Sequence, residues 1–429
     1  MHRKLTTALL LALPACVLDK DLGNGTLLTT DSTGEPGATD DGGATGDGTE
    51  PTTGVPNDCP EGQPHLAQLW QFEYDQFLDF QSSFAPIGRL ADGRIAVPGN
   101  FDLAPDQHGV ALMLVAPDGQ LLGPQTAAPG DKRVGAVAFA IGADDQPVVL
   151  GNHGSDIDGV NIMKLTRFTS DMQLVSQIDV PFVEDRGPPY VPTLALSADG
   201  PVVAGPVPGG PEPVLVKLAP DTGALVWQHT FTATDDLVIT EIAIGPTGDI
   251  AVAGHADTEL DAQDAVRLWR FDPAGAQIWE RVITVPEFEE VTALHFAPDG
   301  QIVALRNGKE FAASVDLVSV EVATGETRWA LTVAAVEDEL GGWAEDMHVD
   351  ADRFTIPMSR SRVHHHAPAD TNWTEVRTVS FAGELLAVTK VPGVLGDGGL
   401  SWLRSVRGRC GELILVRDID SLQVTALAP

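Results

Sequence analysis

The sequence predicts an all-β fold, and three observations lead to this fold class. The chain of 429 residues contains 44 glycines and 31 prolines but only 6% aromatic residues, a composition that suits a protein with many turns. One hairpin pattern recurs along the chain, in which a tight polar turn joins two apolar strands. A second kind of hairpin lies between successive copies of the first.

The first hairpin pattern occurs seven times after residue 60, at intervals of about 48 to 60 residues. Its clearest copy spans residues 87–97, where Asp92-Gly93 forms the turn. Asp-Gly is a strong hairpin signal because Gly accepts a positive φ without steric cost. The other six turns are at Asp144-Asp145, Asp199-Gly200, Thr247-Gly248, Asp299-Gly300, Ala351-Asp352 and Cys410-Gly411.

The second hairpin gives each repeat four short strands. Its turns are at Asp118-Gly119, Ser170-Asp171, Thr222-Gly223, Ala274-Gly275, Thr324-Gly325 and Ala382-Gly383. Two hairpins per repeat are the content of one propeller blade. We therefore expect residues 60–429 to form a single β-propeller of about seven four-stranded blades. Two stacked sandwiches are the alternative, but they would not predict one even period.

The two ends of this region complete each other. Residues 422–427 read as a third strand without a fourth, and residues 67–72 read as a fourth strand without a third. One blade is therefore expected to contain both terminal strands, which closes the ring and leaves no free first or last blade.

The first sixteen residues read as an export signal. Arg3 and Lys4 precede a short apolar run that ends before Cys16. Leu13-Pro14-Ala15-Cys16 resembles the bacterial lipobox, which implies that Cys16 is lipidated (palmitate among its acyl chains) and becomes the mature N-terminus. The alternative is an ordinary secretory signal. The resemblance implies a lipid-anchored lipoprotein of the cell envelope, and Val17, in place of an Asp, favours the outer membrane.

Residues 17–58 differ sharply from the rest in composition. They contain nine acidic residues and one basic residue, Lys20, and they lack aromatic residues. Such a segment cannot bury enough apolar surface to offset the entropy of ordering. We expect a disordered acidic linker, which gives three regions: signal 1–16, linker 17–58 and propeller 60–429.

The net charge of the chain bears on which classes of partner it can bind. The chain carries a net charge of −35, and residues 59–429 retain −29 of it. A domain this acidic is not expected to bind nucleic acid or anionic lipid head groups. Solubility explains the charge without any partner.

The chain has three cysteines, Cys16, Cys59 and Cys410. If Cys16 carries lipid, one pair remains. Export implies an oxidising compartment, so we expect a Cys59–Cys410 disulfide that ties the start of the folded region to its last repeat. Two free thiols are the alternative.

The motif Thr222-Gly223-Ala224-Leu225-Val226-Trp227 resembles the tryptophan-docking motif of pyrroloquinoline-quinone-like propeller repeats. Residues 324–329 carry the same motif, and the run from Val252 to Trp279 resembles repeats of exported myxobacterial propeller lipoproteins. The resemblance implies that tryptophans pack between blades, which suits their large apolar surface. The tryptophans concerned are Trp70, Trp227, Trp279 and Trp329.

The resemblance also bears on cofactors. Quinoprotein dehydrogenases of this family use adjacent cysteines, a calcium-holding carboxylate set and eight blades, and this chain lacks adjacent cysteines. We therefore interpret it as a non-catalytic relative and predict no cofactor. Asp-rich connections leave calcium open, although Asp also favours turns through bonds to its own backbone. His364, His365 and His366 are weak metal candidates, because a solvated loop explains them as well.

Three hypotheses remain for the function of this chain. The first is a non-catalytic scaffold that binds a protein or glycan across the mouth of the central channel, through the loops of residues 206–213, 258–264 and 360–372. The second is an enzyme, either a quinone- or calcium-dependent oxidoreductase or a hydrolase, with its site at the same mouth. The third is a scaffold for outer-membrane assembly. The common hydrolase and phosphate-binding motifs are absent from the sequence.

Overall fold

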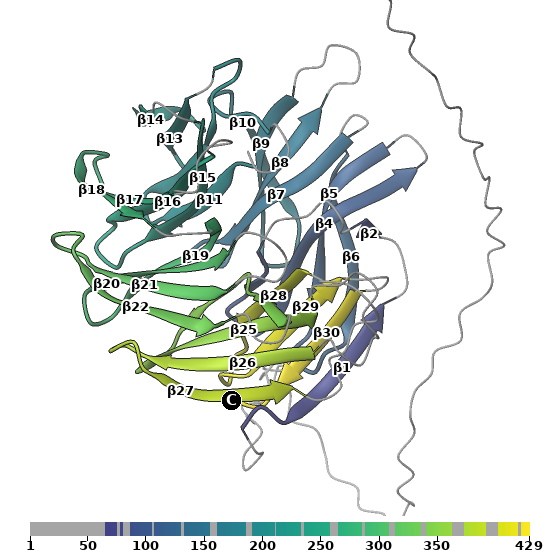
Figure 1. Cartoon of the computed structure of the whole chain (residues 1–429). Helices are drawn as coiled ribbons and strands as arrows, with labels where there is room; N and C mark the ends of the chain where they lie inside the picture. Colours follow the sequence, from purple (N-terminus) through teal and green to yellow (C-terminus); the bar gives the residue numbers. More distant parts are fainter. Residues whose placement is uncertain are drawn as a thin grey trace, which may run out of the picture. The chain divides into compact units, whose positions relative to one another are not determined.

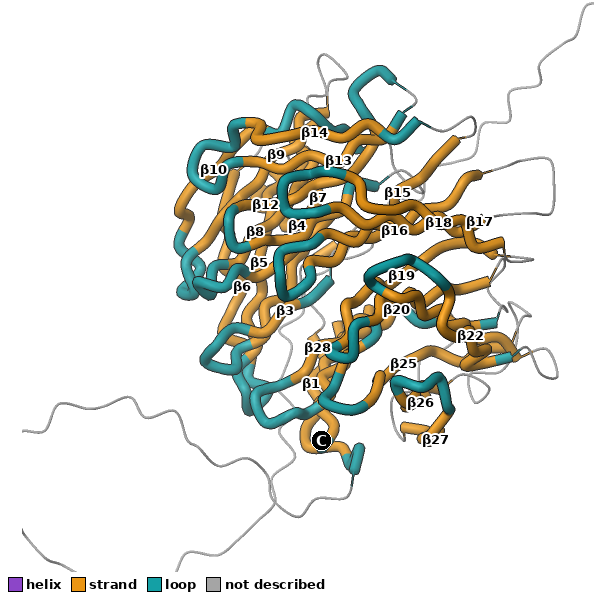
Figure 2. Tube along the Cα trace, turned by 90° about the vertical axis from the view of Figure 1, so that its left-hand side faces the viewer, coloured by secondary structure: helices purple, strands orange, loops and turns teal. Residues whose placement is uncertain are grey.

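The computed structural model contains β-strands joined by turns and loops, with no helix in its described residues (Figure 2). Accordingly, no described helix is long and apolar enough to cross a membrane. The structure describes residues 65–429 apart from 75–77, 80–85, 105–106, 130–132, 155–160, 186–190, 211, 233–235, 258–264, 285–287, 309–313, 336–339, 363–372, 392–401 and 419–421.

The strands form seven antiparallel sheets arranged as the blades of a ring, which confirms the predicted β-propeller (Figure 1). The blades are numbered along the chain. Blade 1 contains β2 (Leu78–Asp79), β3 (Gly88–Arg89), β4 (Ile95–Ala104), β5 (Gln107–Val115) and β6 (Leu121–Pro129), and blade 2 contains β7 (Arg133–Ile141), β8 (Pro147–Gly154), β9 (Asn161–Phe168) and β10 (Leu174–Asp179). Blade 3 contains β11 (Thr193–Ser197), β12 (Gly200–Pro206), β13 (Pro213–Leu218) and β14 (Leu225–Thr230), and blade 4 contains β15 (Asp236–Ile244), β16 (Ile250–Asp257), β17 (Ala265–Phe271) and β18 (Gln277–Thr284).

The remaining blades are blade 5 with β19 (Phe288–Ala297), β20 (Gln301–Gly308), β21 (Val315–Glu321) and β22 (Thr327–Ala334); blade 6 with β23 (Leu340–Trp343), β24 (His348–Val349), β25 (Arg353–Arg362), β26 (Trp373–Ser380) and β27 (Leu385–Val391); and blade 7 with β28 (Trp402–Arg407), β29 (Leu413–Asp418), β30 (Leu422–Leu427) and β1 (Gln68–Tyr74). In blades 1 and 6 the first strand is split in two, and both halves pair with the second strand.

Blade 7 closes the ring as predicted from the chain ends. β1 lies antiparallel to β30, with Tyr74 opposite Leu422 and Gln68 opposite Leu427. Figure 1 shows these strands, from opposite ends of the chain, side by side. The closing blade therefore takes three strands from the C-terminal end and its outermost strand from the N-terminal end.

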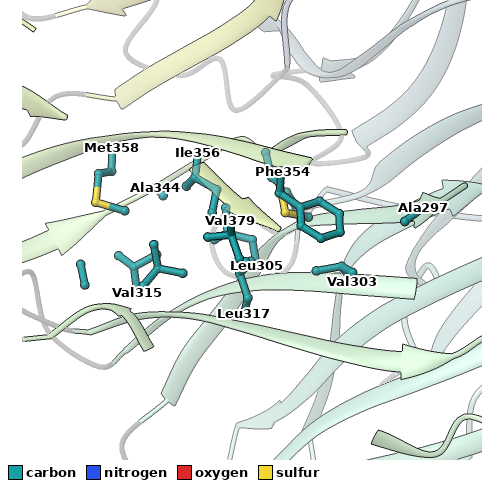
Figure 3. Close-up of a cluster of buried hydrophobic side chains, with 14 residues drawn as sticks. Ala297, Val303, Leu305, Val315, Leu317, Ala344, Phe354, Ile356, Met358 and Val379 are labelled. Atoms are coloured by element: carbon teal, nitrogen blue, oxygen red, sulfur yellow. The ribbon is translucent and has the colours of Figure 1, made fainter. Parts of the chain in front are cut away.

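Seven hydrophobic clusters hold the blades together, one at each interface between neighbouring blades. Between blades 5 and 6, Leu305 and Leu317 pack against Phe354 and Ile356, and all four side chains are fully buried (Figure 3). The middle strands are buried on both faces for this reason, whereas the outermost strand β14 is mostly exposed. Burial at about 25 cal/mol per Å² makes these interfaces the main favourable term in folding.

Candidate functional site

Each of the four predicted tryptophans lies on the outermost strand of its blade and contacts the next blade. In each case the indole Nε1–H donates to a backbone carbonyl of the next blade, just before the turn between the third and fourth strands of that next blade. The donor and acceptor pairs are Trp70 to Pro117 (3.2 Å), Trp227 to Pro273 (3.4 Å), Trp279 to Val322 (2.8 Å) and Trp329 to Phe381 (2.9 Å).

A turn glycine lies under each of these indoles. A Cβ added at Gly275 would lie 2.6 Å from the Trp227 ring, and one added at Gly383 would lie 2.6 Å from the Trp329 ring. Gly119 and Gly325 stand in the same relation to Trp70 and Trp279. These glycines also have positive φ. The turn therefore uses glycine both for its backbone conformation and for contact with the neighbouring blade.

Several other predicted residues lie outside the described residues. Cys16, Cys59, His364, His365 and His366 are among them, as are the loop of residues 258–264 and most of 360–372. Cys410 is disulfide-bonded, and its partner is not among the described residues. Its pairing with Cys59 stays a prediction.

A group of charged side chains lies on or next to the innermost strands, and sequence reasoning did not single it out. We call it the inner cluster: Glu241 on β15, Glu290 on β19, Glu345 and Asp346 between β23 and β24, and Arg404 on β28. Four neighbouring blades, 4 to 7, contribute to it. The first strands of blades 4 and 5, β15 and β19, lie against one another.

The split in the first strand of blade 6 positions two members of the inner cluster. Between β23 and β24, the backbone N–H of Ala344 donates to Asn307 Oδ1 of blade 5 (3.1 Å). The Ala344 carbonyl accepts from Thr292 Oγ1 (2.7 Å) and Asn307 Nδ2 (2.9 Å). These bonds replace the pairing with β25 that a continuous strand would make. The released segment carries Glu345 and Asp346.

Arg404 is the cation of the inner cluster. It forms an ion pair with Glu345, with 3.3 Å between Nη1 and Oε2, and both side chains are largely buried. The indole Nε1–H of Trp343 donates to the other oxygen of Glu345. Burial lowers the pKa of Arg404, but Glu345, Asp346, Glu241 and Glu290 outweigh burial and raise it. The guanidinium therefore stays charged.

Asp346 joins blades 6 and 7. Its Oδ2 accepts from the backbone N–H of Ser405 (2.6 Å) and lies 3.4 Å from the Ser405 hydroxyl. The Nε2 of His348 lies 2.7 Å from the same hydroxyl. Burial raises the pKa of Asp346 to about 6, although Arg404 and the Ser405 bonds lower it. A carboxyl in this condition is partly protonated near neutral pH.

Glu241 and the two nearby histidines also titrate abnormally. Burial, with the carboxylates of Asp346, Glu290 and Glu345, raises the pKa of Glu241 well above its ordinary value, although Arg404 opposes this. Burial lowers the pKa of His295 to about 4 and, with Arg407 and His295, that of His348 to about 3. Both imidazoles are therefore neutral near pH 7.

Ser405 does not form a catalytic triad with these groups. In a triad the carboxylate orients the histidine, and the histidine then accepts the proton of the nucleophile. Here Asp346 binds Ser405 itself, and a His348 pKa of about 3 makes the imidazole a weak base. The described residues also contain no group of three or more His, Cys, Asp or Glu arranged to hold a metal ion.

The inner strands of the opposite blades differ in chemistry. Thr193–Ser197 of β11 contains no charged residue, whereas β7 begins at Arg133 and the split first strand of blade 1 carries Asp79 and Arg89. Comparison of the first strands of the repeats could have drawn attention to single members, because Glu241 is followed by Ile242-Ala243-Ile244 and Arg404 follows Leu403.

Comparisons with known proteins support the fold and go no further. No protein-family model matches the chain, and no curated protein is similar to it in sequence. Solved structures with the same architecture include an ulvan lyase of a polysaccharide lyase family, bound to -[GlcA(1-4)Rha3S]-, with a TM-score of 0.57 and 10% identity over 84% of this chain and 96% of that chain. The likeness is one of fold.

Two further solved structures have the same architecture. The polysaccharide lyase Uly1 has a TM-score of 0.51 and 12% identity, over 87% of this chain and 94% of that chain. The Dos1 propeller has a TM-score of 0.50 and 9% identity, over 84% of this chain and 95% of that chain. Identities this low carry no activity or ligand across, because one fold hosts many functions. The pyrroloquinoline-quinone-like type stays a prediction from the docking motifs.

Proposed function

We propose that this chain is a lipid-anchored propeller of the cell envelope that binds a protein or glycan ligand without catalysing a reaction. The inner cluster is its binding site. The observation that carries this proposal is that four carboxylates from blades 4, 5 and 6 act electrostatically on Arg404 of blade 7, which is ion-paired to one of them.

The cost of this arrangement favours a functional role. Removing carboxylates and a guanidinium from water is expensive, and a pair such as Arg404–Glu345 often contributes little net stability over apolar residues. The interfaces between blades already have apolar clusters, so the fold does not need these charges. Groups whose pKa values depart from normal gather preferentially at functional sites.

The anchor is tested separately from the site. If Cys16 carries lipid, the chain partitions with membranes, and Cys16→Ser releases it into the soluble envelope fraction. Mass spectrometry of the mature N-terminus should find acyl chains on Cys16, and several long chains are needed for stable attachment. A soluble wild-type chain with an unmodified N-terminus would remove the anchor and leave the binding site untouched.

Binding is tested with two matched variants in the full chain. Asp346→Asn removes one carboxylate of the inner cluster, and Asp221→Asn removes one from an exposed turn of blade 3. We expect a ligand found among purified envelope glycans or proteins to bind wild type and Asp221→Asn equally and to bind Asp346→Asn at least about tenfold more weakly. Equal binding by all three would move the ligand away from the inner cluster.

A second candidate is a glycan-cleaving enzyme, which the pKa of Asp346 favours. A carboxyl with a pKa of about 6 can donate a proton to a leaving oxygen near neutral pH, as general acids of this chemistry do. The measurement is the release of reducing ends from polysaccharides. Release by wild type that is lost in Asp346→Asn would replace the binding role with catalysis.

A further inference from the structure

One position on the outermost strand of blade 2 differs from its counterparts in four other blades. Each docking tryptophan lies opposite a residue of the third strand, directly after a β-bulge. The pairs are Trp70 with Ala426, Trp227 with Lys217, Trp279 with Arg270 and Trp329 with Ser319. In blade 2 the same register, with the same bulge, pairs Ser176 with Arg167. Ser176 therefore stands where four other blades carry an indole.

The facing turn of blade 3 keeps the carbonyl that would accept a hydrogen bond from such an indole. Nη2 of Arg167 donates to the Pro220 oxygen (2.9 Å), as Nη1 of Arg270 donates to the Val322 oxygen (3.0 Å). The Val322 oxygen also accepts from the indole of Trp279. Among the described residues, no second side chain donates to the Pro220 oxygen. A carbonyl oxygen has two lone pairs, so one acceptor position remains for an N–H group.

The same turn also keeps its glycine. Gly223 has φ +66°, but this conformation alone does not require glycine, because Met172 takes φ 60° at the corresponding turn of blade 2. Blade 1, which precedes that turn, contains no tryptophan. Glycine is therefore replaced at a turn that receives no indole, whereas Gly223 is retained although blade 2 supplies none. The side chain of Ile178 lies against Gly223.

A shallow cleft lies at this place, on the outer side of the contact between blades 2 and 3. Ser176, Ile178 and Arg167 line it from blade 2, and Pro220 and Gly223 line it from blade 3. It contains about 260 Å³ of empty space, part of which is open to solvent. The cleft therefore combines an apolar lining, a turn glycine and a carbonyl acceptor, which are the three features that each docked indole contacts elsewhere in the ring.

We propose that this cleft binds the side chain of a tryptophan from a partner protein, with its indole N–H donating to the Pro220 oxygen. The four docked tryptophans show which group a surface of this kind receives. The chain does not supply that group itself, because all eight of its tryptophans lie on strands of the propeller and none precedes residue 70. This site goes beyond the proposed function, because it uses no member of the inner cluster.

The probes are short neutral peptides that differ at one residue, which is tryptophan, 1-methyltryptophan or alanine. Methylation of the indole nitrogen removes the N–H and places a methyl group against the Pro220 oxygen, but it keeps the aromatic surface. In ligand-observed NMR titrations with the full chain, we expect the tryptophan peptide to bind wild type at least about tenfold more tightly than either of the others. Free indole represents a small-molecule source of the same chemistry.

The variants fill the cleft or leave it open. Ser176→Trp places an indole of the chain itself in the cleft, so we expect the tryptophan peptide to bind at least about tenfold more weakly. The same variant should have a higher Tm, because it gains the contact between blades that four tryptophans make elsewhere. Val388→Trp adds a tryptophan at an exposed position on the outermost strand of blade 6, and it should keep both the affinity and the Tm of wild type.

Three results would overturn the proposal. One is equal binding of the tryptophan and alanine peptides, another is full affinity in a folded Ser176→Trp variant, and the third is free indole that binds at least about tenfold more tightly than the peptide. If Ser176→Trp does not fold, Ser176→Leu takes its place, because its smaller side chain still occupies the cleft. Failure here leaves the proposed function standing, since that function is tested with Asp346→Asn.

Discussion

The indole Nε1–H of Trp279 in blade 4 donates a 2.8 Å hydrogen bond to the carbonyl oxygen of Val322 in blade 5. The same oxygen accepts a 3.0 Å bond from Nη1 of Arg270, which also belongs to blade 4. The pattern recurs one blade on, where the Phe381 carbonyl accepts from Trp329 and Gln301. In both of these pairs, one turn carbonyl of the following blade therefore binds two side chains of the blade before it.

Replacement of Trp279 should measure the strength of this contact between blades. Trp279→Phe keeps most of the apolar contact with Gly325 and loses the hydrogen bond, so we expect a loss of about 1–2 kcal/mol in the free energy of unfolding. Trp279→Ala should cost about 3–5 kcal/mol. Denaturant unfolding measures both. Trp373→Ala is the control, because the Trp373 indole bonds Glu375 within its own blade, and an equal cost there would contradict a special role for docking.

Two glycines with the same backbone conformation allow a sharper test. Gly275 has φ +85° with the Trp227 ring against it, and Gly300 has φ +84° with no heavy atom within 4 Å of an added Cβ. Both Gly→Ala variants should lose about 1–2 kcal/mol from the positive φ alone. Gly275→Ala should lose about 1–3 kcal/mol more, because the methyl group displaces the indole. If the two variants lose equal stability in thermal unfolding, the Trp227 indole moves aside without an energetic cost.

The fold could be predicted from the sequence because its signals are local and repeated. Each turn appears in the printed sequence, even where glycine is replaced: Asp145 and Met172 take positive φ in blade 2 at positions where other blades have glycine. The pairing of β1 with β30 followed from counting strands, since each end lacked what the other supplied.

The inner cluster could not be predicted in the same way. Glu241 and Arg404 are far apart in sequence, and only ring closure brings blades 4 and 7 to one axis. The contact between Asp346 and Ser405 also depends on the split of the blade 6 strand. That split follows from bonds between Ala344 and side chains of blade 5, which no pattern of strand residues reveals.

The disulfide partner of Cys410 gives a prediction that needs no functional assay. We expect a non-reduced digest to contain one peptide pair joining Cys59 to Cys410, identified by mass spectrometry. The double variant Cys59→Ser with Cys410→Ser should lose about 2–5 kcal/mol of stability, because the bond closes a very long loop in the unfolded chain. A digest that joins Cys410 to Cys16 would contradict both this pairing and the lipid on Cys16.

The pH dependence of stability tests the environment of Asp346. Its pKa is raised from 3.8 to about 6, chiefly by burial. The folded protein therefore holds this proton more tightly than the unfolded chain, so the stabilisation is present below pH 4 and is lost as the pH rises through 6. Asp346→Asn, in which an amide oxygen can still accept from the Ser405 N–H, is neutral at every pH. Relative to wild type it should gain up to about 2 kcal/mol between pH 4 and 7.

Urea unfolding of both proteins at pH 4, 5, 6 and 7 measures this gain. The comparison must be a difference between variants, because His295 and His348 act in the opposite sense: their lowered pKa values reduce stability as the pH falls below 6.5. Those histidines are present in both proteins, so their contribution cancels when the curves are subtracted. A difference that stays constant from pH 4 to 7 would mean that Asp346 titrates as an ordinary exposed carboxyl, and the inner cluster would then lose its proton-holding character.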